Sequence, residues 1–230
     1  LAFGTDTGAT RLTIDSAGNA GLGVVPEVTN PSQTSLQIGG NANISTTKAQ
    51  GASGELDILQ NAYYAANGNH YYISSDEASM IRQGGGQFVF RNVPSGTAGS
   101  PGDIATFTDR LRIDSAGNVG VGVTPKSWYS GFTAMQLSDT GAIWCENVGS
   151  ESSLTIAENC YVASDGVTKY LTTDEASSYQ QNNGTHIFKV AASGTADNEV
   201  TTFNTALTID NAGLATFSNG IALQSAATNP

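Results

Sequence analysis

The chain of 230 residues has few charged residues, and few basic ones in particular. Asp, Glu, Lys and Arg make up 13% of it, against the roughly 25% that is usual in globular domains. There are 9 Lys and Arg in all, the formal net charge is −11, and the sequence contains no basic run. Because neutralising phosphates requires clustered Lys and Arg, this composition argues against a nucleic-acid-binding protein.

Long apolar runs and helical periodicity are also missing. No stretch approaches the roughly 20 apolar residues of a membrane-spanning helix. The N-terminus does not have the charged-then-apolar layout of a signal peptide. The nearest helical candidate, Asp76–Arg82, amounts to a turn or two at most. The sequence therefore predicts no membrane insertion and almost no helix.

The chain has two cysteines and two histidines, and their spacing fits no metal motif. Cys145 and Cys160 form no CxxC or Cys/His pattern, which argues against a zinc site. We expect both cysteines to be small buried residues, with a disulfide between them as the alternative. His70 and His186 occupy different places in the repeat described next. We therefore predict no metal and no cofactor.

One short segment recurs three times. RLTIDSAGN begins at Arg11, RLRIDSAGN at Arg110 and ALTIDNAGL at Ala206, so the starts are 99 and 96 residues apart. The tetrapeptide DEAS that begins at Asp76 returns at Asp174. Self-similarity at a fixed period indicates an array of modules, here of about 98 residues each.

The repeat predicts the division of the chain. Residues 1–23 are expected to end a preceding module, 24–122 to form one module, and 123–220 to form a second. Residues 221–230 are expected to link to the next segment. Because the chain begins inside a module, we expect it to be a fragment of a longer protein.

The repeated segment has the pattern of a β-hairpin. Arg110–Ile113 alternates polar and apolar residues, as a half-buried strand does. Asp114–Gly117 predicts a tight turn, because Asp can bond to the backbone two residues on and Gly accepts a positive φ. Val119–Val123 alternates valine with glycine, which leaves one face bare. We expect another backbone to approach that face, as where three chains pack around an axis.

Other β-like runs are separated by Asn-Gly, Gly-Gly and Ser-Gly-Thr turn signals, so the sequence predicts an all-β fold of tandem β-rich modules. These runs are Leu36–Ile38, Leu56–Leu59, His70–Ser74, Gln87–Arg91, Leu154–Ile156, Lys169–Thr172 and His186–Val190.

Several segments together carry a resemblance that covers nearly the whole chain: Arg112–Pro125, Ser127–Leu137, Asn61–Tyr64 with Tyr71–Ser79, and Ser95–Gly99 with Phe107-Thr108. They resemble modules of phage tail fibres, especially those of marine phages. Such modules lie upstream of a C-terminal intramolecular chaperone, which these residues do not include. The resemblance implies an elongated homotrimer on the virion, outside the cell, that has a structural and host-attachment role. Its implied partners are copies of itself, other tail or fibre proteins, and a host cell-surface glycan or protein.

Two other functions stay open. A polysaccharide-degrading tailspike would release oligosaccharides, and a bacterial surface adhesin would be encoded beside a secretion anchor. The repeated pairs Asp76-Glu77 and Asp174-Glu175 are the nearest approach to a catalytic signal. Glycosidases need two carboxylates about 5–10 Å apart around a sugar, and neighbours on an extended chain point to opposite faces. We therefore favour a structural or capping role over calcium binding or catalysis, and predict no enzyme.

Aromatic residues are the best candidates for receptor contacts. Tyrosine and tryptophan offer a large face with a polar group, which suits sugar and protein surfaces, and loops that differ between the modules commonly carry recognition. Because paired aromatics on a strand usually send one side chain inward, packing in the core or between subunits is the alternative for each. The candidates are Tyr63, Tyr64, Tyr71, Tyr72, Trp128, Tyr129 and Trp144.

Overall fold

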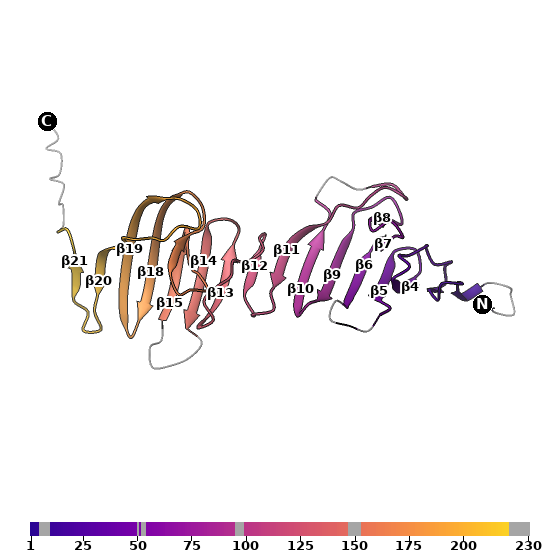
Figure 1. The fold of residues 1–230 in the computed structure, drawn as a ribbon, viewed down its shortest axis with the longest axis horizontal. Helices are drawn as coiled ribbons and strands as arrows, with labels where there is room; N and C mark the ends of the chain where they lie inside the picture. The colour runs from indigo at the N-terminus through magenta and orange to yellow at the C-terminus, as the bar shows by residue number, and fades with distance from the viewer. Residues whose placement is uncertain (5–9, 50, 52–53, 95–98, 147–152, 221–230) are drawn as a thin grey trace, which may run out of the picture. The chain divides into compact units, whose positions relative to one another are not determined.

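The computed structural model describes residues 1–4, 10–49, 51, 54–94, 99–146 and 153–220 (Figure 1). These residues form strands and turns without any helix, which confirms the predicted all-β class. Within the described ranges there is accordingly no helix able to span a membrane. The predicted linker at 221–230 lies outside the described residues.

The chain forms two compact units. Unit 1 comprises Leu1–Ala116 and Gly120–Thr124, and unit 2 comprises Gly117–Val119 and Pro125–Pro230. The division at 23 and 122 expected from the repeat stays a prediction.

Unit 1 is built on one sheet with a small hairpin beside it. The strands of the unit are β1 (Ala2–Gly4), β2 (Thr10–Ile14), β3 (Ala20–Leu22), β4 (Gln33–Ile38), β5 (Ala42–Thr47), β6 (Glu55–Gln60), β7 (Ala62–Tyr64), β8 (His70–Tyr72), β9 (Ser79–Gly84), β10 (Gln87–Asn92) and β11 (Thr108–Ile113). The sheet pairs in the order β1-β2-β3-β4-β5-β6-β9-β10-β11. Only β3 and β4 are parallel among these pairs. β7 and β8 pair with each other.

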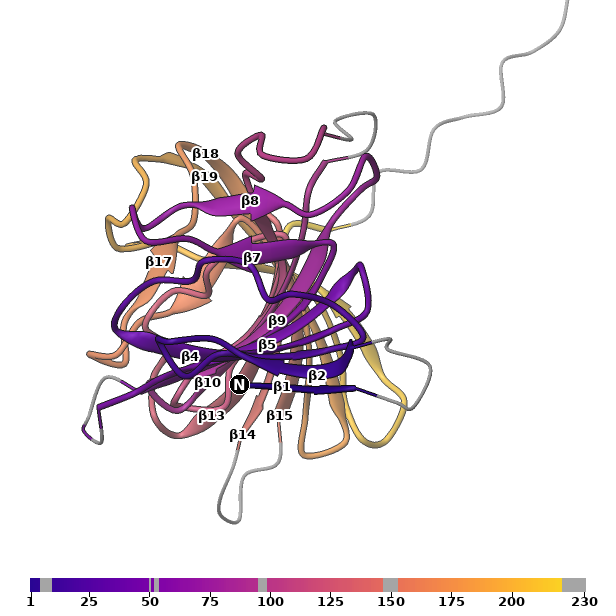
Figure 2. The same cartoon turned by 90° about the vertical axis from the view of Figure 1, so that its right-hand side faces the viewer.

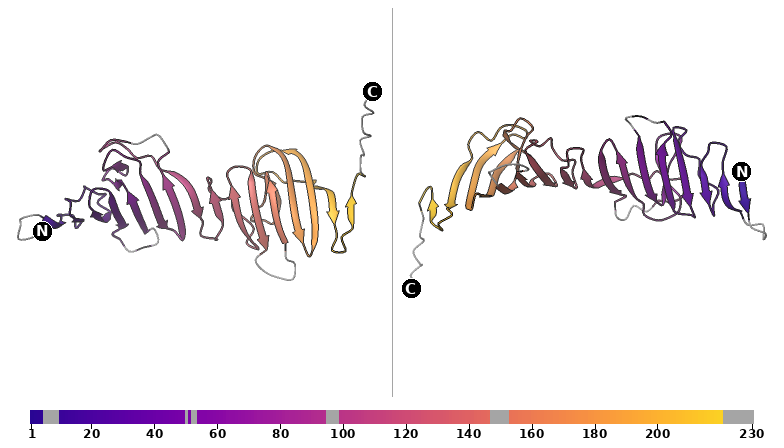
Figure 3. Two further views of the ribbon diagram at one scale, coloured as in Figure 1. Left: turned by 180° about the vertical axis from the view of Figure 1, so that it is seen from behind. Right: turned by 90° about the horizontal axis from the view of Figure 1, so that it is seen from below.

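Unit 2 repeats this pairing order. After β12 (Val119–Val121), its strands are β13 (Phe132–Leu137), β14 (Gly141–Glu146), β15 (Ser153–Glu158), β16 (Cys160–Val162), β17 (Thr168–Tyr170), β18 (Asp174–Asn182), β19 (Thr185–Gly194), β20 (Asn204–Ile209) and β21 (Ala215–Phe217). The sheet pairs antiparallel in the order β13-β14-β15-β18-β19-β20-β21, with β16 and β17 as the separate hairpin. Both views in Figure 3 show these strands side by side.

The predicted Asp-Ser-Ala-Gly turn is confirmed. The Asp15 carboxylate accepts hydrogen bonds from the backbone N–H groups of Ala17 and Asn19, at 2.9 and 2.8 Å. Gly18 has a φ of +87°, in the left-handed region that glycine tolerates best. In the third copy Asp210 accepts from Ala212 and Leu214 in the same way. The aspartate therefore closes each of these hairpins by local bonding.

At Gly21 the backbone that approaches the bare face of the repeat belongs to the same chain, and packing of a second chain against Val119–Val123 stays a prediction. Gly21 lies on β3, within the first copy of the repeat. A Cβ there would stand 2.2 Å from the Val24 carbonyl oxygen and 2.8 Å from Pro26 Cδ. Both atoms belong to the same chain, because the segment after β3 folds back over the glycine. The bare face accommodates the chain's own backbone.

The weak helical candidate Asp76–Arg82 is extended instead. Ser79–Gly84 is strand β9, which pairs with β6 on one side and β10 on the other. The helical periodicity of these seven residues is weak, and the two neighbouring strands supply backbone hydrogen-bond partners on both sides, so the extended conformation is favoured.

The core of each unit lies on one face of its sheet, which we call the inner face. Figure 2 shows β7 and β8 lying across this face in unit 1. The buried core there consists of Leu59, Ala62, Tyr72, Ala78, Met80, Val93 and Ala105, with Phe107 packed against it. The core of unit 2 is more aromatic, since it includes Trp128, Trp144, Tyr161 and Tyr170.

Candidate functional site

The sheet of unit 1 buries polar side chains and exposes apolar ones. On β5, Asn43 and Ser45 are each 1% exposed, whereas Ile44 between them is 37% exposed. On β6, Asp57 is fully buried and its neighbour Ile58 is 42% exposed. Successive residues of a strand point to opposite faces. The apolar side chains therefore stand on the face opposite the core, which we call the outer face.

These outward residues form a continuous row across the strands of unit 1. Each member lies directly opposite the next on the neighbouring strand, so their side chains are in cross-strand contact range. The outer row of unit 1 is Leu36, Ile44, Ile58, Ile81, Phe90 and Leu111, on β4, β5, β6, β9, β10 and β11.

Unit 2 carries a row at the same register. Tyr179 and Phe188 stack within it, with ring centroids 4.8 Å apart. Ile156 is 48% exposed and Phe188 is 39% exposed. The outer row of unit 2 is Met135, Ile143, Ile156, Tyr179, Phe188 and Leu207, on β13, β14, β15, β18, β19 and β20.

Shallow hollows lie along both outer rows. In unit 1 a hollow of about 440 Å³ is lined by Ile58, Ile81 and Phe90 among others. In unit 2 a hollow of about 370 Å³ is lined by Ile156 and Phe188 among others. Apolar hollows of this kind at matching places offer room for side chains of another molecule.

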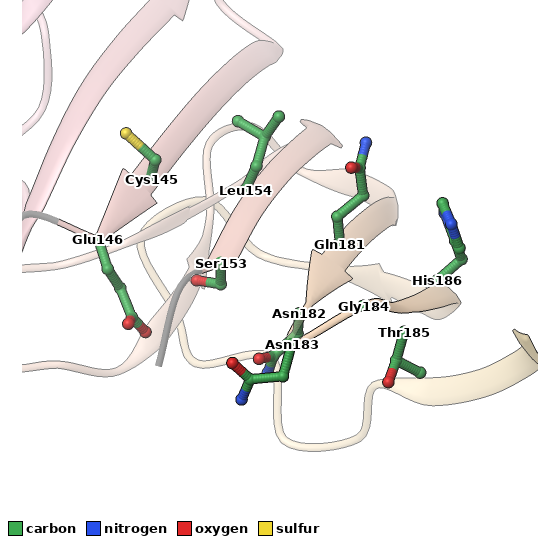
Figure 4. Close-up of a pocket in the computed structure, with 10 residues that line it drawn as sticks. All are labelled: Cys145, Glu146, Ser153, Leu154, Gln181, Asn182, Asn183, Gly184, Thr185 and His186. Carbon is green, nitrogen blue, oxygen red and sulfur yellow. The ribbon is translucent and has the colours of Figure 1, made fainter. Parts of the chain in front are cut away.

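A further hollow of about 370 Å³ lies at the end of β14, β15, β18 and β19 (Figure 4). Cys145, Leu154, Gln181 and His186 stand on one side of the strands there, whereas Glu146 points to the other side. His186 Nδ1 lies 2.5 Å from the Tyr179 hydroxyl, so that ring nitrogen already has a partner. Cys145 and His186 are separated by β15 and β18, because the register runs Cys145, Leu154, Gln181, His186, so the thiol and the imidazole are not in contact.

The cysteines differ from expectation in one respect. Both are free thiols, Cys160 is fully buried as predicted, and Cys145 is exposed, which corrects the prediction that it would be buried. Cys145 is exposed because it falls on the outer face of β14, next to the inward Trp144. Burial raises the pKa of the Cys160 thiol to about 12, so it is not a reactive nucleophile. Among the described residues no group of three His, Cys, Asp or Glu side chains could hold a metal ion.

Three of the seven aromatic candidates lie in the cores. Trp128, Trp144 and Tyr72 are 6%, 7% and 3% exposed. The two indole rings pack against each other with centroids 5.4 Å apart, and Trp128 also meets Tyr161 edge-on. These three side chains are packing residues in this conformation, so a receptor cannot contact their faces.

The other four candidates stay accessible. Tyr63 and Tyr71 face each other across the β7–β8 hairpin, with ring centroids 6.1 Å apart. The Tyr64 ring packs at a tilt against His70, with ring centroids 5.0 Å apart, and all of these residues are half-buried. Tyr129 is 42% exposed and belongs to unit 2. The hairpin of unit 1 is thus the place where the structure gathers predicted contact residues.

The repeated acidic pair has a structural role through its backbone. Asn61 is fully buried with a φ of 56°, and its Nδ2 donates to the carbonyl oxygens of Ser74, Asp76 and Glu77, each at 3.0 Å. In unit 2 Asn159 donates to the Glu175 carbonyl at 2.7 Å. A buried asparagine therefore anchors the segment that carries each acidic pair, which supports the structural interpretation.

Two groups of residues were not found from the sequence. The outer rows could not be predicted, because a period-2 pattern distinguishes the two faces of a strand but does not show which face packs on the core. The second group is a set of arginines on the inner face of unit 1, Arg82, Arg91 and Arg112, which are far apart in sequence.

Comparison with models of protein families, with curated proteins and with solved structures finds no match for this chain.

Proposed function

We propose that the chain is a structural and host-attachment segment of a phage tail fibre, in which three copies pack their outer rows together and bind without catalysis. The outer row of each unit is the observation that carries this proposal. The fibre itself rests on the resemblance of Arg112–Pro125 and the other quoted segments to phage tail-fibre modules.

Exposed apolar rows are a thermodynamic reason for assembly. Fully burying an exposed Leu, Ile or Phe side chain contributes about 1.5–3 kcal/mol, so covering the 37–42% of Ile44, Ile58 and Phe90 that is still exposed contributes roughly 0.5–1 kcal/mol each. Each unit presents six such positions, all apolar or aromatic, in one unbroken line. A monomer would leave these rows in water, whereas a partner with its own flat apolar face would cover them.

Copies of the same chain suit these rows better than an unrelated partner. The two units have the same strand pairing order and the same row register, so parallel copies would present matching surfaces along their lengths. The low content of charged residues limits repulsion between identical faces. This similarity of the units also supports tandem modules of about 98 residues, and the family resemblance supplies the number three.

Receptor contact falls to residues that the assembly would leave outside. Tyr63, Tyr64 and Tyr71 on the β7–β8 hairpin lie on the inner-face side of unit 1, away from the outer row. Tyr129 is the exposed candidate of unit 2. A trimer presents each weak site three times, so modest affinity per site gives firm attachment through avidity.

The proposal is tested on the particles that carry this chain. Gold-labelled antibodies raised against the 230-residue chain should decorate tail fibres in electron micrographs. Labelling of a bacterial envelope would instead show a surface adhesin. The purified chain, incubated with host polysaccharide, should release no oligosaccharide; release would show a tailspike enzyme.

A further inference from the structure

Three arginines gather around one cavity on the inner face of unit 1. Arg82 on β9, Arg91 on β10 and Arg112 on β11 line a cavity of about 370 Å³. The chain has 9 Lys and Arg in total and a net charge of −11, so a third of its cationic residues meet at this place. The one carboxylate among the lining residues is that of Glu55.

The guanidinium groups are held in fixed orientations. Asp57, whose side chain is fully buried, binds Arg82 through two bonds of 2.8 Å to Nε and Nη2. Asp109 accepts from Arg91 Nε at 2.5 Å and from Arg112 Nη2, and Gln87 accepts from Arg112 Nη1. Neither aspartate is among the lining residues of the cavity. Arginine forks fixed in this way are suited to planar or tetrahedral oxyanions, because little side-chain freedom is lost on binding.

The cluster has donor capacity that the protein does not use. Arg112 Nε is buried and has no hydrogen-bond partner among the described residues. A buried donor without a partner costs free energy, which an acceptor would recover if the atoms covering Arg112 Nε move aside. Burial opposes ionisation of Asp109, yet hydrogen bonds from Arg112 and Arg91 hold its pKa below the ordinary value. Arg82 Nη1 also donates to Glu55 Oε1 at 3.3 Å, so the three arginines that line the cavity are paired with three carboxylates, of which only Glu55 lines the cavity itself.

The fold does not require this charge. In unit 1 the inner-face register runs Asp57, Arg82, Val89, Arg112 across four strands. In unit 2 the same four positions are occupied by residues without charge, Thr155, Gln180, Ile187 and Thr208, in the same register. Arg91 keeps a cationic counterpart in Lys189, so the charges particular to unit 1 are those of Arg82 and Arg112, whose places are taken by Gln180 and Thr208 in unit 2.

We propose that this arginine cavity binds an oxyanion group, a carboxylate or a sulfate, carried by an acidic polysaccharide. The choice of a polysaccharide as the carrier rests on the proposed host-attachment function. The choice of an oxyanion as the bound group rests on the arginines that line the cavity. Arg82 points away from the outer row, because its neighbour Ile81 belongs to that row. Assembly through the outer rows therefore leaves the cavity accessible, and each trimer presents three such sites.

The test is titration calorimetry of the full chain with three probes: a short polyuronate, a sulfated oligosaccharide and a neutral oligosaccharide of the same length. One or both acidic probes should bind, and the neutral probe should bind at least ten-fold more weakly. Which acidic probe binds more tightly identifies the group. No binding of either acidic probe at millimolar concentration would overturn the proposal.

Variants that copy unit 2 locate the site. Arg112→Thr should weaken binding of the acidic probe at least ten-fold. Arg110→Thr is the matched control, because Arg110 is exposed and bonds to Asn92 outside the lining residues. It should change binding by less than two-fold. The double variant Arg82→Gln/Asp57→Thr removes the ion pair without leaving a buried charge, and should also lose binding. Equal binding by wild type, Arg112→Thr and the double variant would refute the assignment.

The outcome separates this proposal from the fibre proposal. Binding of an acidic probe that depends on Arg112, in a chain that stays monomeric, would uphold the site and refute the trimer. A stable trimer that binds neither acidic probe would refute the site alone.

Discussion

Ile58 and Ile44 lie opposite each other on β6 and β5 and both are exposed, while their strand neighbours Asp57 and Ser45 lie opposite each other and are buried. The sheet thus has its polar side inward and its apolar side outward at this point. In a lone globular domain the hydrophobic effect favours the reverse arrangement. We therefore expect the exposed side chains of Ile44 and Ile58 to become buried only when the chain assembles.

The indole pair should dominate the stability of unit 2. Trp144→Ala should lower the free energy of unfolding by about 3–5 kcal/mol, because it opens a cavity beside Trp128. Ser45 on β5 is the residue of unit 1 at the position that Trp144 occupies on β14, because Ser45 lies opposite Asp57 as Trp144 lies opposite Thr155. Ser45→Ala is therefore the control, and it should lower the free energy of unfolding by about 1 kcal/mol or less. Chemical denaturation at one fixed protein concentration measures both. Equal losses would show that Trp144 contributes no more packing than a serine.

Asn61 combines a left-handed backbone with a set of buried hydrogen bonds. Asn61→Ala removes the bonds to the Ser74, Asp76 and Glu77 carbonyls and also strains the backbone, so we expect a loss of about 2–4 kcal/mol. Asn61→Gly removes the same bonds but accepts the φ of 56° without strain. It should lose about 1 kcal/mol less than the alanine variant. If the alanine variant melts at the wild-type temperature, the anchoring role is wrong.

Gly21 should not tolerate a side chain. Gly21→Ala places Cβ 2.2 Å from the Val24 carbonyl oxygen, so the segment after β3 must shift, at a cost of about 1–3 kcal/mol or more. Gly40→Ala is the control, because a Cβ there meets nothing within 4 Å and the φ of Gly40 is not in the left-handed region. Thermal unfolding should separate the two variants clearly. A neutral Gly21→Ala would mean that the chain does not fold back over β3.

His70 should make stability depend on pH. Burial lowers its pKa from 6.5 to about 4 in the folded chain, and the charges of Asp57, Arg82 and Arg91 modify that shift. Below pH 6.5 the unfolded chain binds a proton that the folded chain does not, so stability falls as the pH drops from 6.5 toward 4. The contribution is on the order of 2–3 kcal/mol.

His70→Phe is the variant that isolates this effect, since Phe can pack against Phe107 as the imidazole does at 5.3 Å. It should reduce the loss of stability between pH 6.5 and pH 4, and the loss that is left comes from carboxylates with lowered pKa values such as Asp15 and Asp109. Denaturation curves of both proteins across that range provide the comparison, and an unchanged slope in the variant would contradict a buried neutral histidine.

The sequence predicted the local structure well and the role of each face poorly. The turn at Asp15 and the seven β-like runs follow from residue chemistry and period-2 patterning, which are local. That Trp128 and Trp144 pack in the core, whereas Tyr129 is exposed, depends on strand pairing between distant segments. The meeting of Arg82, Arg91 and Arg112 depends on the register of β9, β10 and β11, which no single segment specifies.

Sedimentation equilibrium of the 230-residue chain tests the central claim most directly. At micromolar concentration the wild type should sediment at three times the chain mass of 23.6 kDa. Ile58→Asp places a charge in the outer row and should shift the population to monomer, with at least a ten-fold weaker association. Val28→Asp, a substitution at a residue that is 74% exposed and outside the row, should leave the trimer intact. A wild-type chain that is folded and monomeric at 23.6 kDa would contradict assembly through the outer rows.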